Sequence, residues 1–212
     1  TKEADLLPQV GHLDRVGAGA ADVGVEQSAD REGVVASMFE QGPNSALSDS
    51  LMESYGFDVY VPKDYEWTTE GDVFLFRKTG SDSLDVVRHV TVTWRSPIPS
   101  GMQGDGLLAW RSQLAAAHYG SPQRVSLGAA QASQTTHEGN VTYQLLGNWS
   151  GTRGGKTQSG PFILRAEICP TQDRMYLLDG WLYAPDQDQH AYLVELESIL
   201  NSFRCGSARS AP

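Results

Sequence analysis

The sequence predicts an α+β fold, in which a mostly antiparallel sheet has its helices packed on one face. Hydrophobic residues make up 40% of the 212 residues, which is enough for a substantial core. Segments with the alternation of strands follow one another across short turns, and this order favours antiparallel pairing. A helix follows each of two groups of strands, which suggests an internal duplication of a strands-then-helix unit.

The chain divides into a main domain and two terminal segments. Residues 1–43 contain several glycines and little periodicity, so they are expected to be loosely ordered apart from one helix near residues 34–39. The α+β domain is expected over residues 44–204. Residues 205–212 are expected to form a short tail.

The first half of the domain, about residues 44–120, is predicted to contain two helices around a group of strands. Asn44 is a typical N-cap for the first helix, and Gly56 lies where a left-handed C-cap belongs. Asp105 is expected to cap the second helix, which ends near Tyr119. Alternating apolar residues predict three strands between these helices, around residues 57–61, 74–76 and 90–94.

The second half, about residues 121–204, is predicted to contain five strands and a final helix. His137-Glu138-Gly139-Asn140 is typical of a hairpin turn. The helix is expected from about Asp188 to Phe203, with an apolar stripe that includes Leu196 and Leu200 and faces the sheet. The five strands are expected near residues 124–128, 131–136, 141–149, 161–169 and 174–183.

Charge argues against two classes of partner. The formal net charge is -10, and the Lys and Arg residues form no run. A phosphate backbone and an anionic membrane surface are therefore disfavoured as partners. No apolar run approaches the roughly 18–20 residues that span a bilayer. The chain starts at Thr1 with no export signal, so we expect it to be the C-terminal part of a longer precursor.

A nucleotide-binding loop is not expected. Gly155-Lys156-Thr157 matches the end of the phosphate-loop pattern, but Ser150 stands where that pattern has its first glycine. A strand-like segment beginning at Pro161 follows, in place of the helix whose N-terminus would hold phosphate. A flexible loop between two strands explains residues 151–157 better.

Metal and catalytic patterns are weak. The histidines lack the spacing of metal ligands, and Asp186-Gln187-Asp188 lacks the later ligands of a calcium loop. Glu195 and Glu197, two residues apart, cannot share a helix face. No catalytic, cofactor-binding or metal-ligating residue and no cofactor is therefore assigned. The five histidines considered are His12, His89, His118, His137 and His190.

Asp179 allows two interpretations, because it lies within an apolar strand. If its side chain is buried, its carboxyl group is expected to have a raised pKa, which would make it a candidate functional residue. If Leu178 faces the core, simple alternation turns Asp179 to solvent instead. The alternation favours the solvent-facing interpretation.

Several segments resemble those of one protein family in the same order. They include Tyr55-Gly56-Phe57, the helix around Arg111, Gly147-Asn148-Trp149, Gly160-Pro161-Phe162 and Asp179-Gly180-Trp181-Leu182-Tyr183-Ala184-Pro185. This pattern resembles domain-of-unknown-function family 4837, whose members are envelope lipoproteins of Bacteroidota. The resemblance covers about residues 45–203. It implies a periplasmic or outer-membrane-anchored protein and supplies no catalytic residues.

The two cysteines, Cys169 and Cys205, are either one disulfide or two unpaired thiols, depending on the compartment. Cys169 ends a predicted core strand, and Cys205 lies just past the final helix, which packs back over the sheet. A helix rises about 1.5 Å and a strand about 3.3 Å per residue, so the two ends can meet. With the envelope location that the resemblance implies, we predict that they form a disulfide.

Our leading functional hypothesis is a non-enzymatic envelope protein that binds another envelope protein or a small ligand. Membrane contact is expected only through a lipid anchor that this chain lacks. The alternative is a hydrolase or other enzyme with an unrecognised site. Polar side chains with perturbed pKa values in one deep cleft would favour the enzyme, and a broad apolar patch would favour the binding protein.

Overall fold

The computed structural model describes residues 29–80, 86–125 and 130–206. Residues 29–38 are helical. The elements that follow are α2 (Ser45–Tyr55), β1 (Phe57–Asp58), β2 (Glu66–Glu70), β3 (Val73–Thr79), β4 (Val87–Arg95), α3 (Asp105–His118), β5 (Gln123–Val125), β6 (Gln131–His137), β7 (Asn140–Arg153), β8 (Lys156–Cys169), β9 (Arg174–Tyr183), α4 (His190–Asn201) and β10 (Arg204–Cys205).

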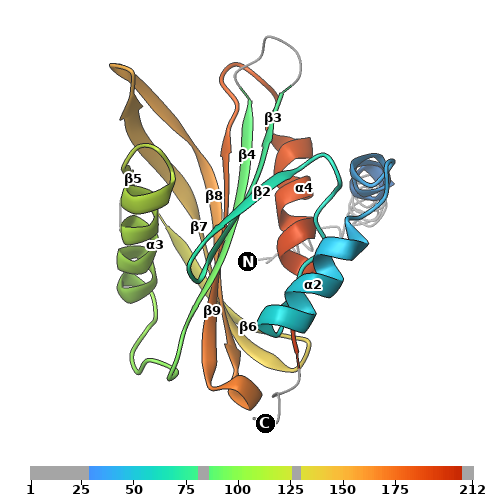
Figure 1. Ribbon diagram of the computed structural model, residues 1–212. Coiled ribbons are helices and arrows are strands. Elements are labelled where there is room, and N and C mark those ends of the chain that lie inside the picture. Colours follow the sequence, from blue (N-terminus) through green and yellow to red (C-terminus); the bar gives the residue numbers. More distant parts are fainter. Residues whose placement is uncertain (1–28, 81–85, 126–129, 207–212) are drawn as a thin grey trace, which may run out of the picture.

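The sheet has eight strands, and every pair of neighbours is antiparallel. Its order is β2-β3-β4-β9-β8-β7-β5, and β6 pairs with the same edge of β7 as β5 does (Figure 1). The short strands β1 and β10 form a separate pair. The predicted α+β class with a mostly antiparallel sheet is confirmed. Each half has its strands-then-helix order, and a duplication of that unit stays a prediction.

The expected placement of the helices on one face is wrong, because both faces of the sheet are covered. Helices α2 and α4 lie on one face and α3 lies on the other (Figure 1). The central strands explain this: Leu177 and Leu178 in β9 point to opposite faces and are both fully buried. An apolar sheet face needs a covering layer, so strands that are apolar on both faces require helices on both.

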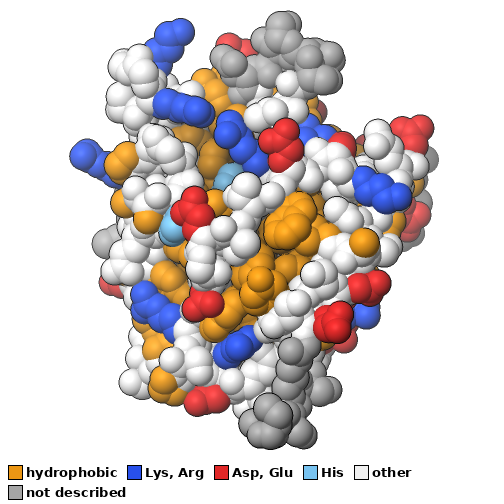
Figure 2. Space-filling model, in the orientation of Figure 1, with side chains coloured by type: hydrophobic (Ala, Val, Ile, Leu, Met, Phe, Trp, Pro, Cys, Tyr) orange, Lys and Arg blue, Asp and Glu red, His pale blue; other side chains and the backbone are white. Residues whose placement is uncertain are grey.

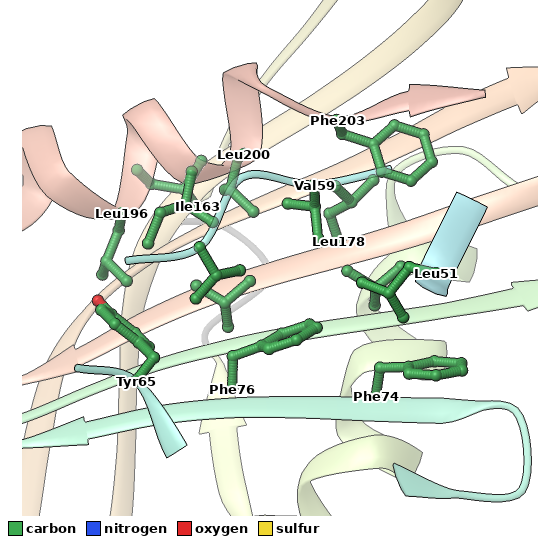
Figure 3. Close-up of a cluster of buried hydrophobic side chains, with 14 of the residues drawn as sticks. Leu51, Val59, Tyr65, Phe74, Phe76, Ile163, Leu178, Leu196, Leu200 and Phe203 are labelled. Carbon is green, nitrogen blue, oxygen red and sulfur yellow. The ribbon is translucent and has the colours of Figure 1, made fainter. Parts of the chain in front are cut away.

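The core beneath α4 is the larger of two apolar clusters. Leu196, Leu200 and Phe203 lie over the sheet, facing Leu178 and side chains of β3 (Figure 3). Gly180 allows the close approach, since a Cβ at this position would lie 3.2 Å from Leu200 Cδ1. A larger residue at this position would therefore push against Leu200 of α4. Within the described ranges, every helix falls short of the length or hydropathy that a membrane span requires.

Most predicted helix ends are close to the observed ones. The Asn44 side chain accepts a hydrogen bond from the Leu47 N–H at 3.3 Å, and Gly56 is a left-handed C-cap. Asp105 is wrong as a cap: Gly104 is the N-cap of α3 and Asp105 belongs to its first turn. Helix α4 is shorter than predicted at both ends, and Asp188 accepts from the His190 N–H just before its start.

Two strand predictions need correction. Strands β7 and β8 continue through residues 151–157, so this segment is a hairpin with a two-residue turn, not a flexible loop. Gly154 and Gly155 both have positive φ, as such a tight turn requires. Sequence analysis also missed β2, an edge strand whose residues are all exposed and so lack an apolar alternation. The turn at residues 137–140 is present as predicted.

Cys169 and Cys205 form the predicted disulfide, with their Cα atoms 6.2 Å apart. Cys205 is thus part of β10 and not the start of a tail, because β10 pairs with β1. The Gln172 side chain donates to the carbonyl oxygens of Gly56 and Gly206, at 2.5 and 2.7 Å. The ends of β8, β1 and β10 are therefore held together. The remaining tail and residues 1–28, including His12, lie outside the described residues.

Replacing Leu200 with alanine should lower the free energy of unfolding by about 2–5 kcal/mol, because the side chain is 1% exposed between α4 and the sheet. Urea unfolding of the purified variant measures this change. Leu146→Ala, at a position 38% exposed, is the control and should cost clearly less. A cost under half a kcal/mol for Leu200→Ala would show that α4 is peripheral.

Candidate functional site

A buried ion pair joins α3 to the middle of the sheet. Arg111 Nε donates to Asp179 Oδ1 at 3.0 Å, and both side chains are fully buried. Asp179 lies on the α3 face of β9, between Leu177 and Trp181. The expectation that Asp179 faces solvent is therefore wrong. Successive side chains of β9 do point to opposite faces, as expected. Each face is covered by a packed layer, so neither side of the strand is in contact with water.

Further polar groups complete the pair. The Tyr119 O–H, just after α3, donates to Asp179 Oδ2 at 2.8 Å, and Arg111 Nη2 donates to Gln123 Oε1 at 2.6 Å. The Arg111 guanidinium also lies 4.3 Å from the centre of the Phe162 ring. Burial raises the pKa of Asp179, although Arg111 opposes this, and burial raises the pKa of Tyr119 well above its ordinary value. The phenol is therefore neutral at neutral pH.

His89 lies next to this network on the same face. Its ring stacks on Trp181 with centroids 4.9 Å apart and planes 18° from parallel, and its Nδ1 is 3.3 Å from Thr91 Oγ1. Burial, together with the charges of Arg77 and Arg111, lowers the pKa of His89 to about 3. The imidazole is therefore neutral at neutral pH, with one donor and one acceptor nitrogen.

A hollow of about 320 Å³ opens above these groups, where α3 ends. We call it the α3 hollow. Its lining includes His89, Tyr119 and Trp181, and β2 and β3 supply Thr68 and Leu75. Figure 2 shows histidine, Lys and Arg side chains gathered on this upper left part of the surface. The hollow exists because α3 stops at His118 while the strands continue beyond it.

A second hollow of about 390 Å³ adjoins the first, since Arg77 and Arg153 line both. Val87 and Tyr183 are part of its lining. At the rim of the α3 hollow, His118 Nδ1 is 2.7 Å from Glu70 Oε2, which ties the end of α3 to edge strand β2. The two hollows thus form one continuous concave face of the sheet beyond α3.

A second buried charge cluster lies under α4, on the other face. Glu195 accepts from Arg88 Nη1 at 2.7 Å and from the Tyr65 hydroxyl at 3.0 Å. Its neighbour Glu197, also in α4, pairs with Arg31 at 2.8 Å. The two glutamates do occupy different faces of α4, as their spacing predicts. This cluster is packed between helix and sheet and is a structural contact.

The histidines considered as candidates do not form one site. His89 and His118 line the α3 hollow. His137 lies between Glu167, at 3.0 Å, and the carbonyl oxygen of Asn201, at 2.9 Å. His190 is 3.2 Å from Asp30. Among the residues that the structure describes, no group of three or more His, Cys, Asp or Glu side chains is arranged to hold a metal ion.

Sequence analysis missed the residues that make the α3 hollow a site. Arg77 and Arg153 come from strands far apart in the chain, and nothing in the local pattern of either strand indicates that they line one hollow. Tyr119 follows the end of α3, and no sequence pattern around it indicates that it lines the hollow. One signal was available: His89 and Thr91 alternate with Val90, which places two polar side chains on a buried strand face.

The segments that carry the family resemblance meet at this site. Phe162 of Gly160-Pro161-Phe162 is the strand partner of Trp181 in Asp179-Gly180-Trp181, and Trp149 packs edge-on against Trp181 at 5.4 Å. Trp149 Nε1 donates to the Leu182 carbonyl oxygen at 3.1 Å. A Cβ at Gly160 would overlap this same oxygen. Residues distant in sequence thus build one interior beneath α3.

The chain belongs to the DUF4837 family. This family, described as a domain of unknown function, matches residues 44–202. The match includes both buried charge clusters and every described helix from α2 to α4. No curated protein matches the chain significantly.

Solved structures of low sequence identity share part of the arrangement. The Saccharomyces cerevisiae Ran-binding protein Mog1p is 10% identical, with a TM-score of 0.42 over 71% of this chain and 90% of its own. LpqN, involved in cell envelope biogenesis of Mycobacterium tuberculosis, is 14% identical, with a TM-score of 0.39 over 71% and 83%. A Pseudomonas aeruginosa protein of unknown function, PA94, is 9% identical, with a TM-score of 0.38 over 73% and 92%. At these TM-scores the likeness says nothing about what this chain binds.

Removing one partner of the Arg111–Asp179 pair should destabilise the protein by about 3–5 kcal/mol, because the other charge stays buried without compensation. We expect this cost for Arg111→Met and for Asp179→Val, measured by urea unfolding. The double variant should lose less than the sum of the two, since neither charge is then buried alone. Additive costs would contradict a direct coupling.

His89 should make the protein less stable as the pH falls. Its pKa is about 3 in the folded state and about 6.5 in the unfolded state, so below pH 6.5 only the unfolded state takes up the proton. The free energy of unfolding should fall by up to about 1.4 kcal/mol per pH unit between these values. Unfolding curves from pH 7 to pH 4.5 should be less pH-dependent for His89→Gln than for the wild type. Equal pH dependence would contradict the shift.

Proposed function

We propose that this protein is a binding module of the cell envelope that acts without chemistry of its own, and that the α3 hollow is its ligand site. One observation carries the proposal. The hollow, of about 320 Å³, has a floor of three aromatic rings, those of His89, Tyr119 and Trp181, whose centres lie 4.9 to 5.6 Å apart. A concave site lined by aromatic side chains and a few polar groups is the usual form of a small-ligand site.

The polar groups of the hollow support binding over catalysis. Shifted pKa values in a cleft are a feature that can indicate an enzyme. Here the shifts keep His89 and Tyr119 neutral, far from the pKa near 7 that suits a general acid or base. Neutral groups with fixed hydrogen-bonding positions instead suit recognition of a ligand. The enzyme alternative would draw on Glu66, Thr68, His118 and Tyr119 as the other reactive groups in the described lining of the hollow.

A location in the envelope is part of this proposal. The Cys169–Cys205 disulfide supports an oxidising compartment, such as the periplasm. Anchoring to the outer membrane as a lipoprotein is the finer form of the same proposal. The net charge of -10 supports a partner other than nucleic acid. Figure 2 also shows an apolar patch between β2 and α2, a feature that suits a binding protein as well.

A bulky side chain placed in the hollow tests whether it binds ligands. Thr68 is the strand partner of Leu75, so Thr68 and Leu75 share the face that lines the hollow, while Thr69 faces the other way. Both threonines are exposed on the same edge strand. Thr68→Trp should therefore fill the hollow, and Thr69→Trp is its matched control.

A library of neutral and charged fragments, screened by protein-observed NMR, provides the measurement. We expect some fragments to shift the resonances of His89, Gly120 and the Trp181 indole in the wild type and in Thr69→Trp, and to lose this effect in Thr68→Trp. If no fragment shifts these resonances, or if Thr68→Trp binds as well as the control, the hollow is not the ligand site.

A further inference from the structure

We infer that the α3 hollow binds a small ligand in which a planar, largely apolar group carries an oxyanion, either a carboxylate or a phosphate. This inference rests on the proposed function, since it names the class of ligand for the same site. It follows from two features of the hollow: two arginines in its lining and a flat aromatic floor.

The two arginines come from strands near opposite edges of the sheet. Arg77 is two residues beyond Leu75 on β3, and Arg153 is the last residue of β7, on the same face as Trp149. Both line the α3 hollow and the adjoining hollow, so they lie where the two meet. The lining of the hollow thus contains two cations although the chain as a whole carries a charge of -10.

Both arginines lack an acidic partner within the part of the chain that the structure describes. Neither Arg77 nor Arg153 has a carboxylate of a described residue within 4.0 Å. Glu66 lines the hollow and is the strand partner of Arg77, but it forms no such contact. Glu70 is occupied by His118. The guanidinium groups therefore present donors whose planar geometry fits a carboxylate or phosphate.

The floor of the hollow fits a planar group. His89 and Trp181 are stacked, and Tyr119 lies 4.9 Å from His89 and 5.6 Å from Trp181, measured between ring centres. Flat side chains of this kind hold another ring by offset stacking and by burial of apolar area. Because His89 is neutral at neutral pH, the floor itself adds no positive charge.

The size of the hollow limits the ligand that it can hold. The volume of about 320 Å³ is near the lower end for ligand sites, which suits one ring with one anionic group. The adjoining hollow leaves room for a longer ligand.

Four small probes separate the contributions. Benzoate and phenyl phosphate carry both a ring and an oxyanion, benzamide is the neutral counterpart of benzoate, and inorganic phosphate is the anion alone. Each is titrated into the ¹⁵N-labelled full chain, and dissociation constants are taken from chemical shifts. The Trp181 indole resonance, assigned with Trp181→Phe, reports on the aromatic floor of the hollow. Comparison of benzoate with phenyl phosphate distinguishes the two oxyanions.

We expect benzoate or phenyl phosphate to bind at least about tenfold more tightly than benzamide and to shift the Trp181 indole resonance. Arg77→Gln and Arg153→Gln should each weaken that binding by about tenfold. Arg124→Gln removes the same charge from an exposed position in β5 that lines neither hollow, and it should leave binding unchanged.

Two results would overturn the inference. Benzamide binding as tightly as benzoate, or arginine variants that bind like Arg124→Gln, would show that the hollow does not select an anion. Failure of all four probes, while other fragments still bind in a Thr68-dependent way, would also overturn the ligand class and leave the binding site itself standing. A hollow that binds no fragment at all would overturn the proposed function.

Discussion

The charge pair between Arg111 and Asp179 fixes how α3 sits on the sheet. Apolar contacts alone would let a helix slide or rotate on a sheet face, since they have little directional preference. The Arg111 guanidinium must instead donate to one carboxylate and one amide, in a buried layer that excludes water. It therefore allows far fewer helix positions than apolar contacts do. The end of α3 is placed by the same network, because Tyr119 donates to Asp179. The α3 hollow therefore takes its position from a buried contact that no ligand touches.

The tripeptide Asp179-Gly180-Trp181 shows how one strand serves two layers. Asp179 and Trp181 face α3, where one holds the helix and the other forms the floor of the hollow. Gly180 faces α4 and leaves space for Leu200. Three successive residues thus connect the two helices with the hollow. This explains in physical terms why the segment is among those that carry the family resemblance.

Local patterns predicted the antiparallel strands and most helix ends, because each of these depends on residues close in sequence. The disulfide prediction needed more, namely a packing relation that allows Cys169 and Cys205 to meet and the envelope location that the family resemblance implies. Asn44 and Gly56, for example, act as caps through their own backbone neighbours. The placement of α3 could not be predicted in this way. Which face a helix covers depends on which sheet faces are apolar across several strands. The adjacent Leu177 and Leu178 point to opposite faces, but they indicate two buried faces only when each is known to lie in an apolar core. The lining of the hollow could be predicted even less, since Arg77 and Arg153 belong to strands that three other strands separate in the sheet.

The disulfide changes how the chain would carry a mechanical load. Cys205 is bonded to the end of β8, one of the central strands, and Gly206 donates to the Gly56 carbonyl oxygen at 2.8 Å. Tension applied beyond Cys205 would pass through sulfur to the middle of the sheet and would bypass α4 entirely. Helix α4 would then stay packed over Gly180 while the chain that follows it is pulled.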